Sequence, residues 1–359
     1  MNETQYYKNI KNKKIAIFGI TPPPFGGVSI HIQRVAQKFK EQNNRVYHFK
    51  TEFRGRRYLL PVYLLYAAFF LIKNKIDIVY YHSSYLPNSM PEIRFLVWFK
   101  KFLSYDFVLV EHNCRHMYKR SPKVINKFKK SIKNIDQIVF MGCLPQKSYI
   151  DKNIEITDKC VIDNAFLPPD ESQENKIVKT YPKELFTFIN QKRPLLLANA
   201  SILSFLNGKD VYGFDKTIRA FEKLKKEYPD IGLILALAHI GNTQYFKALL
   251  SLIKKCKLTN NIFFLTGQKE LWPLLKKIDI FLRPTTCDGT SISLSEAIFF
   301  KIKVIASNVC KRPKEAIIFD IHDDDDFVNK ILAAIKNKAK ENINEHIKQR
   351  RCSHQRSTR

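Results

Sequence analysis

Two carboxylates flank a short polar loop in the second half of the chain. Asp288 precedes Gly289, Thr290 and Ser291, and Glu296 follows them. Glycine permits close approach of the backbone to a ligand, and the two hydroxyls can donate hydrogen bonds to phosphate oxygens. One carboxylate could then reach a sugar and the other the hydroxyls of a ribose. These residue types in this order predict an anion site, and the two carboxylates would have these roles if a sugar nucleotide lay across it.

A buried strand and a helix are expected to position this loop. The apolar run 278–282 comes directly before it, and Leu294 and Ala297 after it have the spacing of one helix face. The free N–H groups at a helix start and the positive end of its dipole attract anions. An alternative is that Ser293 and Glu296 form a capping box, S-x-x-E, at the start of an ordinary helix. Both can hold together, because a cap and a ligand use the same N–H groups.

A glycine pair near the N-terminus is a second candidate phosphate site. Gly26 and Gly27 follow the β-rich run 14–18 and precede a helical pattern that includes Ile32 and Val35. Strand, glycine-rich turn and helix together are typical of the first unit of a parallel α/β domain. Neither the dinucleotide fingerprint nor a Walker A loop is present. A plain tight turn that needs no ligand is the alternative.

The pattern of a short apolar strand followed by a helix occurs in two separate series. The first covers 1–166 and the second 193–335, and each predicts a doubly wound parallel sheet. The segment 167–192 contains Pro168-Pro169 and many polar residues, so we expect an interdomain linker there. The remaining residues, 336–359, form a basic C-terminal tail.

The loop between the carboxylates resembles the E-x7-E motif of retaining glycosyltransferases with the GT-B fold, in particular glycosyltransferase family 4, also called glycosyl transferases group 1. Here the motif reads Asp288-x7-Glu296, with aspartate in place of the first glutamate, and 303–307 fits the next strand of the family. The resemblance covers most of the chain and is weakest between 50 and 133. It implies an α/β protein of GT-B architecture, in which two Rossmann-like parallel-sheet domains face a central cleft. The first domain would bind the acceptor and the second the nucleotide-sugar donor.

The resemblance also implies roles for individual residues. Glu296 would hold the ribose hydroxyls and Asp288 the donor sugar, and the Gly26-Gly27 loop would face the donor diphosphate. His112 matches in position the histidine that family members carry near the donor sugar. We expect His82, at the end of another strand, to hydrogen-bond only loop backbone.

One position departs from the family pattern. The family clamps the diphosphate with an arginine and with a lysine that precedes a glycine, and here Tyr212 stands where that lysine would be. Lys209 is a candidate replacement cation, although a plain surface lysine is the alternative reading. We therefore expect phosphate recognition to depend more on the backbone N–H groups of Gly289, Thr290 and Ser291.

No cluster of metal ligands is visible in the sequence. The seven cysteines include no C-x-x-C pair, so neither a zinc site nor a disulfide framework is indicated. The acidic run Asp323–Asp326 predicts a helix start, because consecutive acids in a helix point around the cylinder. We therefore expect no metal and no other cofactor.

The charge of the chain implies an anionic partner. The 359 residues include 61 Lys and Arg but only 33 Asp and Glu, a net charge of +28. Basic residues adjoin bulky apolar ones in the first half, as in helices that lie on membranes. The candidate contacts to a membrane or acceptor are Arg56, Arg57, Arg94, Trp98 and Lys101. For the apolar run 59–72, a core helix is the alternative.

The leading hypothesis is a retaining glycosyltransferase that moves a sugar from a nucleotide-diphosphate sugar to a saccharide acceptor. The acceptor is expected to be lipid-linked, in bacterial surface polysaccharide or lipopolysaccharide synthesis. The polar N-terminus lacks the apolar core of a secretory signal, so we expect a cytoplasmic protein, peripheral at the inner face of the cell membrane. One alternative is a GT-B-fold epimerase, which would turn over free sugar nucleotide without an acceptor. Another is a basic nucleic-acid-binding protein, but no nucleic-acid module is recognisable and the basic residues are spread along the chain.

Overall fold

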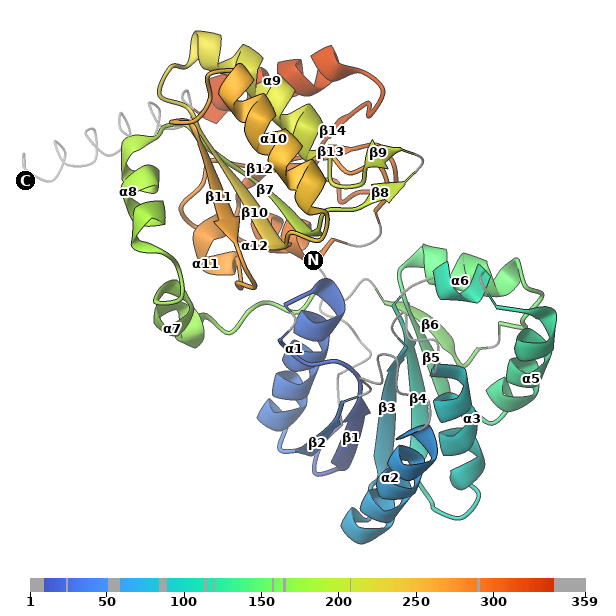
Figure 1. Cartoon of the computed structure of the whole chain (residues 1–359). Coiled ribbons are helices and arrows are strands. Elements are labelled where there is room, and N and C mark those ends of the chain that lie inside the picture. Colours follow the sequence, from blue (N-terminus) through green and yellow to red (C-terminus); the bar gives the residue numbers. More distant parts are fainter. Residues whose placement is uncertain are drawn as a thin grey trace, which may run out of the picture. The chain divides into compact units, whose positions relative to one another are not determined.

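The computed structural model describes residues 10–23, 25–50, 59–83, 89–112, 115–118, 120–156, 158–163, 166–206, 208–288 and 291–338. The chain folds into two compact units, Met1–Pro169 and Asp170–Arg359 (Figure 1). The division falls within the segment 167–192 that the sequence suggests as a linker.

The first unit is built on a six-stranded parallel sheet with the order β2-β1-β3-β4-β5-β6. Its strands are β1 (Lys14–Phe18), β2 (Arg45–Phe49), β3 (Ile78–Ser83), β4 (Asp106–Glu111), β5 (Gln137–Met141) and β6 (Cys160–Asp163). Its helices are α1 (Gly27–Glu41), α2 (Leu60–Asn74), α3 (Ser89–Phe99), α4 (Arg115–Tyr118), α5 (Pro122–Ile132) and α6 (Cys143–Ile150). Apolar clusters cover both faces of the sheet, since Ile15 and Ile17 pack in one cluster while Ala16 and Phe18 pack in the other. Burial on both faces explains why these strands are almost continuously apolar in sequence.

The second unit repeats this plan with the order β11-β10-β7-β12-β13-β14. Its main strands are β7 (Leu195–Ile202), β10 (Gly232–His239), β11 (Ile262–Thr266), β12 (Ile280–Arg283), β13 (Lys303–Ser307) and β14 (Ile317–Phe319), and β8 (Phe205–Leu206) pairs with β9 (Lys209–Asp210) in a separate hairpin. Its helices are α7 (Glu174–Val178), α8 (Lys183–Gln191), α9 (Phe214–Glu227), α10 (Thr243–Lys255), α11 (Trp272–Leu275) and α12 (Ile292–Phe299), with a 3-10 turn η3 (Glu171–Gln173).

A last helix covers residues 324–338. A carboxylate oxygen of Asp323 accepts the N–H groups of Asp325 and Asp326, both at 2.9 Å. The prediction of an acidic helix start is therefore confirmed, because this side chain caps the first turn. Residues 339–359, which make up most of the predicted basic tail, lie outside the described residues.

Most of the segment 167–192 is helical and belongs to the second unit. Leu185 and Ile189 of α8 lie four residues apart on one helix face and are buried in the core of that unit. The hydroxyl of Tyr181 donates to the carbonyl oxygen of Glu270 at 2.6 Å. The second unit therefore starts at Asp170 and not at 193, because the polar residues of this segment hide a helix with an apolar face.

Helix α2 is not a core helix, contrary to the alternative reading of the run 59–72. Only its small or central residues Ala67, Ala68 and Leu71 are buried. Five of its large apolar side chains are between 53% and 69% exposed, namely Val62, Leu65, Tyr66, Phe69 and Ile72. The helix packs through a narrow strip and turns a wide apolar face outward. No helix in the described part of the chain is long and apolar enough to cross a membrane.

Each sheet has a point at which the strand order reverses. In the first unit β1 lies between β2 and β3, and in the second unit β7 lies between β10 and β12. In open parallel sheets, ligands bind beyond the carboxyl ends of the strands at such a switch point. Gly26 and Gly27 follow β1 in the first unit and Asp288 follows β12 in the second, so these candidates lie beyond the carboxyl ends of strands at the two switch points.

Candidate active site

In the second unit, two loops meet at the switch point between β7 and β12. Gly213, which precedes α9, has a φ of +66°, and a Cβ there would lie 2.3 Å from the carbonyl oxygen of Pro284. Only glycine permits this approach. The N–H of Thr286 donates to the carbonyl oxygen of Val211 at 2.9 Å. These contacts fix the loop after β12 against the segment that contains Tyr212.

Asp288 lies at the centre of a buried ion cluster in this loop. Arg283, the last residue of β12, donates to both carboxylate oxygens of Asp288 at 2.9 Å. The guanidinium group of Arg312 donates a third hydrogen bond to the Asp288 carboxylate at 2.8 Å. The hydroxyl of Thr285 donates a further, uncharged one at 3.2 Å. Arg283 also contacts the side-chain oxygen of Asn199 on β7 at 3.2 Å. The cluster therefore ties the ends of the two central strands together.

The electrostatics of this cluster keep all three groups charged. Burial alone would raise the pKa of Asp288, but the guanidinium groups of Arg283 and Arg312 hold it well below its ordinary value. The side chains of the three residues are 9%, 10% and 3% exposed. Two cations and one anion leave one net positive charge, which favours an anionic ligand nearby.

The sequence indicates Asp288 but not its two partners. Arg283 stands five positions before it, and Arg312 stands 24 positions after it in a segment without a motif. The predicted contact of Asp288 with a donor sugar stays a prediction. In the structure its oxygens receive arginine N–H groups, so its immediate role is to position two cations.

Helix α12 begins at Ser291, whose side chain accepts the N–H of Leu294 at 3.3 Å. The capping box of Ser293 with Glu296 is therefore wrong, because the helix starts two residues earlier and Glu296 lies inside it. The hydroxyl of Ser293 instead accepts a hydrogen bond from the side chain of Asn199 at 2.9 Å. Glu296 is 5% exposed. The predicted contact of Glu296 with ribose hydroxyls stays a prediction.

The other candidate residues for donor binding in the second unit do not belong to the ion cluster. Lys209 is exposed on the β8–β9 hairpin. The guanidinium carbon of Arg283 lies 5.4 Å from the ring centroid of Tyr212, the residue that replaces the family's lysine. Arg283 thus brings a positive charge to this side of the loop. Gly289 and Thr290 lie outside the described residues, and their predicted contacts to phosphate stay predictions.

In the first unit, the glycine pair forms the start of α1. Gly26 is the N-cap residue and Gly27 the first helical residue. The N–H of Gly26 donates to the side chain of Ser29 at 2.9 Å. A Cβ at Gly26 would meet only the Ser29 hydroxyl, at 3.9 Å, and the backbone there (φ −132°, ψ 166°) suits any residue. Neither packing nor backbone geometry requires glycine at 26, and its predicted contact with a phosphate stays a prediction.

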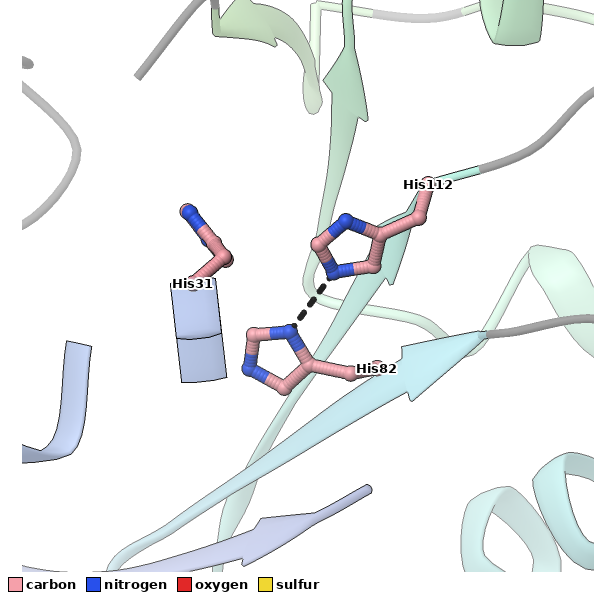
Figure 2. Close-up of side chains that lie close together, drawn as sticks. All are labelled: His31, His82 and His112. Atoms are coloured by element: carbon pink, nitrogen blue, oxygen red, sulfur yellow. Dashed lines mark hydrogen bonds between the residues drawn. The ribbon is translucent and has the colours of Figure 1, made fainter. Parts of the chain in front are cut away.

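His112 belongs to a group of three histidines at the switch point of the first unit (Figure 2). His82 lies near the carboxyl end of β3, and His112 directly follows the neighbouring strand β4. His31 comes from α1. Nδ1 of His82 lies 2.9 Å from Nε2 of His112. The expectation that His82 bonds only loop backbone is wrong, because parallel neighbours β3 and β4 bring their carboxyl ends, and these two rings, together.

Burial keeps two of these imidazoles neutral. Desolvation and the nearby charge of Arg34 lower the pKa of His31 to about 3. Desolvation, followed by the neighbouring histidines, lowers the pKa of His82 well below its ordinary value. The sequence missed His31 because it falls in the middle of an amphipathic helix, where a histidine gives no signal of its own.

The predicted membrane or acceptor residues lie at the surface of the first unit. Arg94 and Trp98 of α3 and Lys101 just beyond it are exposed, and Trp98 is 51% exposed. Because these residues are four and three positions apart, they lie on the same side of α3 and its C-terminal extension. Arg56 and Arg57 lie outside the described residues. Figure 1 shows α2 and α3 as neighbours on the same face of the sheet.

Comparison with known proteins supports the resemblance seen in the motif. Residues 189–351 match the family model described as Glycosyl transferases group 1. An uncharacterized glycosyltransferase of Methanocaldococcus jannaschii is 26% identical over 272 residues, which are 74% of this chain and 56% of the relative. The chain therefore spans little more than half of that relative's length.

Solved structures with a similar fold cover nearly the whole chain. HepE of Anabaena, in complex with UDP, has a TM-score of 0.64 at 14% identity over 90% of both chains. A glycosyltransferase of Rickettsia africae has a TM-score of 0.60 at 15% identity, over 90% of this chain and 89% of that one. The trehalose-6-phosphate synthase OtsA has a TM-score of 0.61 at 13% identity, over 90% and 91%. The chain thus has the GT-B fold, and its second unit carries the sequence pattern of the glycosyl transferases group 1 family.

Proposed function

We propose that this chain is a retaining glycosyltransferase that transfers a sugar from a nucleoside-diphosphate sugar to a saccharide acceptor. The observation that supports it most is the buried ion cluster of Arg283, Asp288 and Arg312 at a switch point, which α12 with its buried carboxylate Glu296 follows in the chain. A carboxylate suits ribose hydroxyls, and a net positive cluster beside a helix N-terminus suits a diphosphate. The ribose and the diphosphate of a sugar nucleotide therefore each have a matching group in the second unit.

The chemistry asks for stabilisation of the leaving diphosphate. As the bond from sugar to phosphate loosens, the sugar becomes oxocarbenium-like and negative charge grows on the phosphate oxygens. The N–H groups at the start of α12 and the two arginines are fixed before the reaction, so no reorganisation is needed. In this proposal Asp288 acts mainly by holding Arg283 and Arg312, and Ser291 can donate its hydroxyl proton while it caps the helix. Gly289, Thr290 and Lys209 are further proposed donor contacts.

The first unit would contribute further hydrogen-bonding groups. His112 is proposed to contact a hydroxyl of the donor sugar, with its ring held by His82 at 2.9 Å. The N–H groups at Gly26 and Gly27 are proposed to approach the diphosphate. No cofactor is part of this scheme.

A UDP-sugar is the first donor to test, because the similar HepE structure was solved with UDP and with UDP-glucose. Purified protein is incubated with a panel of sugar nucleotides and candidate saccharide acceptors, and release of the nucleoside diphosphate is measured. Proton NMR of the new glycosidic bond then reports the anomeric configuration. The proposal expects release that depends on acceptor, with the donor's configuration kept. Turnover of the sugar nucleotide without acceptor would instead show an epimerase, and inversion would contradict the retaining mechanism.

The acceptor is proposed to be lipid-linked, met at an anionic membrane surface in surface polysaccharide or lipopolysaccharide synthesis. Support comes from a surface that we name the α2–α3 patch. Its exposed apolar residues are Val62, Leu65, Tyr66, Phe69, Ile72, Trp98 and Phe102, and its exposed basic residues are Lys73, Arg94 and Lys101. An apolar face with basic neighbours fits the boundary between lipid headgroups and acyl chains. A patch of this kind on the inner face of the membrane would bring the acceptor to the first unit.

A further inference from the structure

Three histidines that are far apart in sequence converge in the first unit (Figure 2). His31 comes from the second turn of α1, His82 from β3 and His112 from the end of β4. Gly19, just after β1, makes the convergence possible. A Cβ there would lie 2.5 Å from a methyl carbon of Ile32 and 3.2 Å from Cβ of His82. The glycine lets α1 approach the sheet, so that His31 faces the other two rings.

The geometry of the three rings is that of a ligand set. One ring nitrogen from each histidine can be chosen so that all three lie within 4.8 Å of one another. The ring centroids of His31 lie 5.8 Å from His82 and 5.1 Å from His112. A zinc ion with N ligands at about 2.0–2.1 Å in a tetrahedron places those nitrogens about 3.3 Å apart. Nδ1 of His82 lies 2.9 Å from Nε2 of His112, so these two rings are already in direct contact.

His82 also has a buried nitrogen that needs a partner. Its side chain is almost completely buried, at 1% exposed. Nε2 has no hydrogen-bond partner among the described residues. An unsatisfied buried polar atom is costly, and in native structures it usually has an explanation such as an ion.

We propose that His31, His82 and His112 bind one divalent transition-metal ion of the Zn²⁺, Co²⁺ or Ni²⁺ class. Imidazole nitrogens suit these ions, and three protein ligands leave a fourth position for water or another molecule. His112 is only partly buried, so the fourth position can be reached from outside. No motif in the sequence indicates this site, because His31, His82 and His112 come from three separate elements.

The consequence of this site rests on the proposed function. If His112 contacts the donor sugar, an ion on the same ring competes with that contact. Metal bound to His112 would then slow transfer, and removal of the metal would restore it. The metal site itself is tested without donor or acceptor, so its failure is separate from a failure of the transferase proposal.

The test uses the full chain without a histidine tag, freed of metal by a chelator and then dialysed. Co²⁺ is titrated in, and the visible absorption of a nitrogen-ligated ion is recorded. Zn²⁺ is then added, which should displace Co²⁺ and remove the absorption. The variants are His31→Gln and His82→Gln. The matched control is His322→Ala, an exposed histidine in the second unit.

We expect one equivalent of Co²⁺ in the wild-type protein and in His322→Ala. Loss of an outer-sphere partner already weakens metal binding about 10–100-fold, so each ligand variant should lose about 100-fold or more. Melting curves without metal show whether each variant is folded, and a folded variant of either histidine suffices for the comparison. The proposal is overturned if the wild-type protein binds no ion, or if a folded His31→Gln or His82→Gln protein binds it as the wild type does.

Discussion

The two switch points share one topology, but buried ionisable groups are charged at one and neutral at the other. In the second unit Asp288 is buried and stays charged, because two arginines hold its pKa well below the ordinary value. In the first unit His31 and His82 are buried and stay neutral, because burial lowers their pKa values and the neighbouring basic groups lower them further. Desolvation acts at both places, and the presence or absence of a counter-charge decides the outcome.

This contrast gives each unit a different capacity. A cluster with net positive charge binds phosphate oxygens, whereas neutral imidazoles can donate and accept hydrogen bonds with sugar hydroxyls. The same fold can therefore carry a charged cluster in one unit and a group of neutral imidazoles in the other. If the contrast is real, changes to the charged cluster should cost most in stability. Changes in the first unit should appear in pH dependence and ligand binding.

The largest effect is expected from Asp288→Asn. This change leaves the buried guanidinium groups of Arg283 and Arg312 without a counter-charge, which typically costs about 3–5 kcal/mol. Urea unfolding of the second unit measures the loss. The control Asp325→Asn removes an exposed pair with Lys223 and should cost about 1 kcal/mol or less. Equal costs for both variants would show that the cluster is not an effectively buried ion network.

A second effect concerns Glu92, a buried carboxyl in the first unit that accepts a hydrogen bond from Tyr81. Desolvation raises the pKa of Glu92 from 4.5 to about 7, and the Tyr81 bond lowers it only in part. Because the folded pKa is above the unfolded one, stability is complete below about pH 4.5 and is lost as the pH rises towards 7. The difference corresponds to about 3 kcal/mol.

Glu92→Gln should remove this loss. The variant's stability relative to wild type should rise by about 3 kcal/mol between pH 4.5 and 7.5, measured by urea unfolding at each pH. Taking the difference between the two proteins cancels the titration of the histidines. A constant difference across this range would mean that Glu92 has the same pKa in the folded and the unfolded protein.

Gly26→Ala tests the neutral side of the comparison. A methyl group at 26 has free space in the protein, so stability should fall by about 1 kcal/mol or less, the cost of alanine at an N-cap. If a diphosphate approaches this backbone, the methyl group should weaken donor binding by about 1–3 kcal/mol. Calorimetric titration with the donor and a melting curve separate the two effects. Unchanged affinity would leave Gly26 as a simple turn residue.

The smallest effects per residue are expected at the α2–α3 patch. Each basic side chain near an anionic surface contributes about 1 kcal/mol, so Arg94→Ala and Lys101→Ala should each weaken binding to anionic liposomes modestly. Added salt should weaken it further. Lys226→Ala, an exposed lysine of the second unit, is the matched control. Co-sedimentation that is equal for all three variants would assign the attraction to total charge and not to this patch.

The strands could be predicted closely from the sequence. The run 14–18 coincides with β1, because strands buried on both faces are apolar throughout. The start of α12 was misplaced, since Ser291 and Ser293 are both good caps and only the hydrogen bond to Leu294 chooses between them. The segment 167–192 was taken for a linker because its prolines and charges mask the short apolar face of α8.

The partners within the site could not be predicted. His82 and His112 are 30 residues apart, and Asp288 and Arg312 are 24 apart, so no local spacing connects them. Their proximity comes from the order of strands in each sheet, which a single sequence does not reveal. Local motifs therefore indicated which loops matter, whereas the electrostatic character of each site required the tertiary structure.

The central claim, that α12 holds the ribose of a sugar nucleotide, is tested most directly by donor affinity in Glu296→Gln. This variant keeps the shape of the side chain and removes its charge, and Glu296 is not a cap, so the melting temperature should change little. Loss of a charge-assisted hydrogen bond should weaken donor binding by about 1.5–3 kcal/mol, measured by calorimetric titration of the donor that the wild-type protein prefers. Wild-type affinity in a folded Glu296→Gln protein would contradict the account.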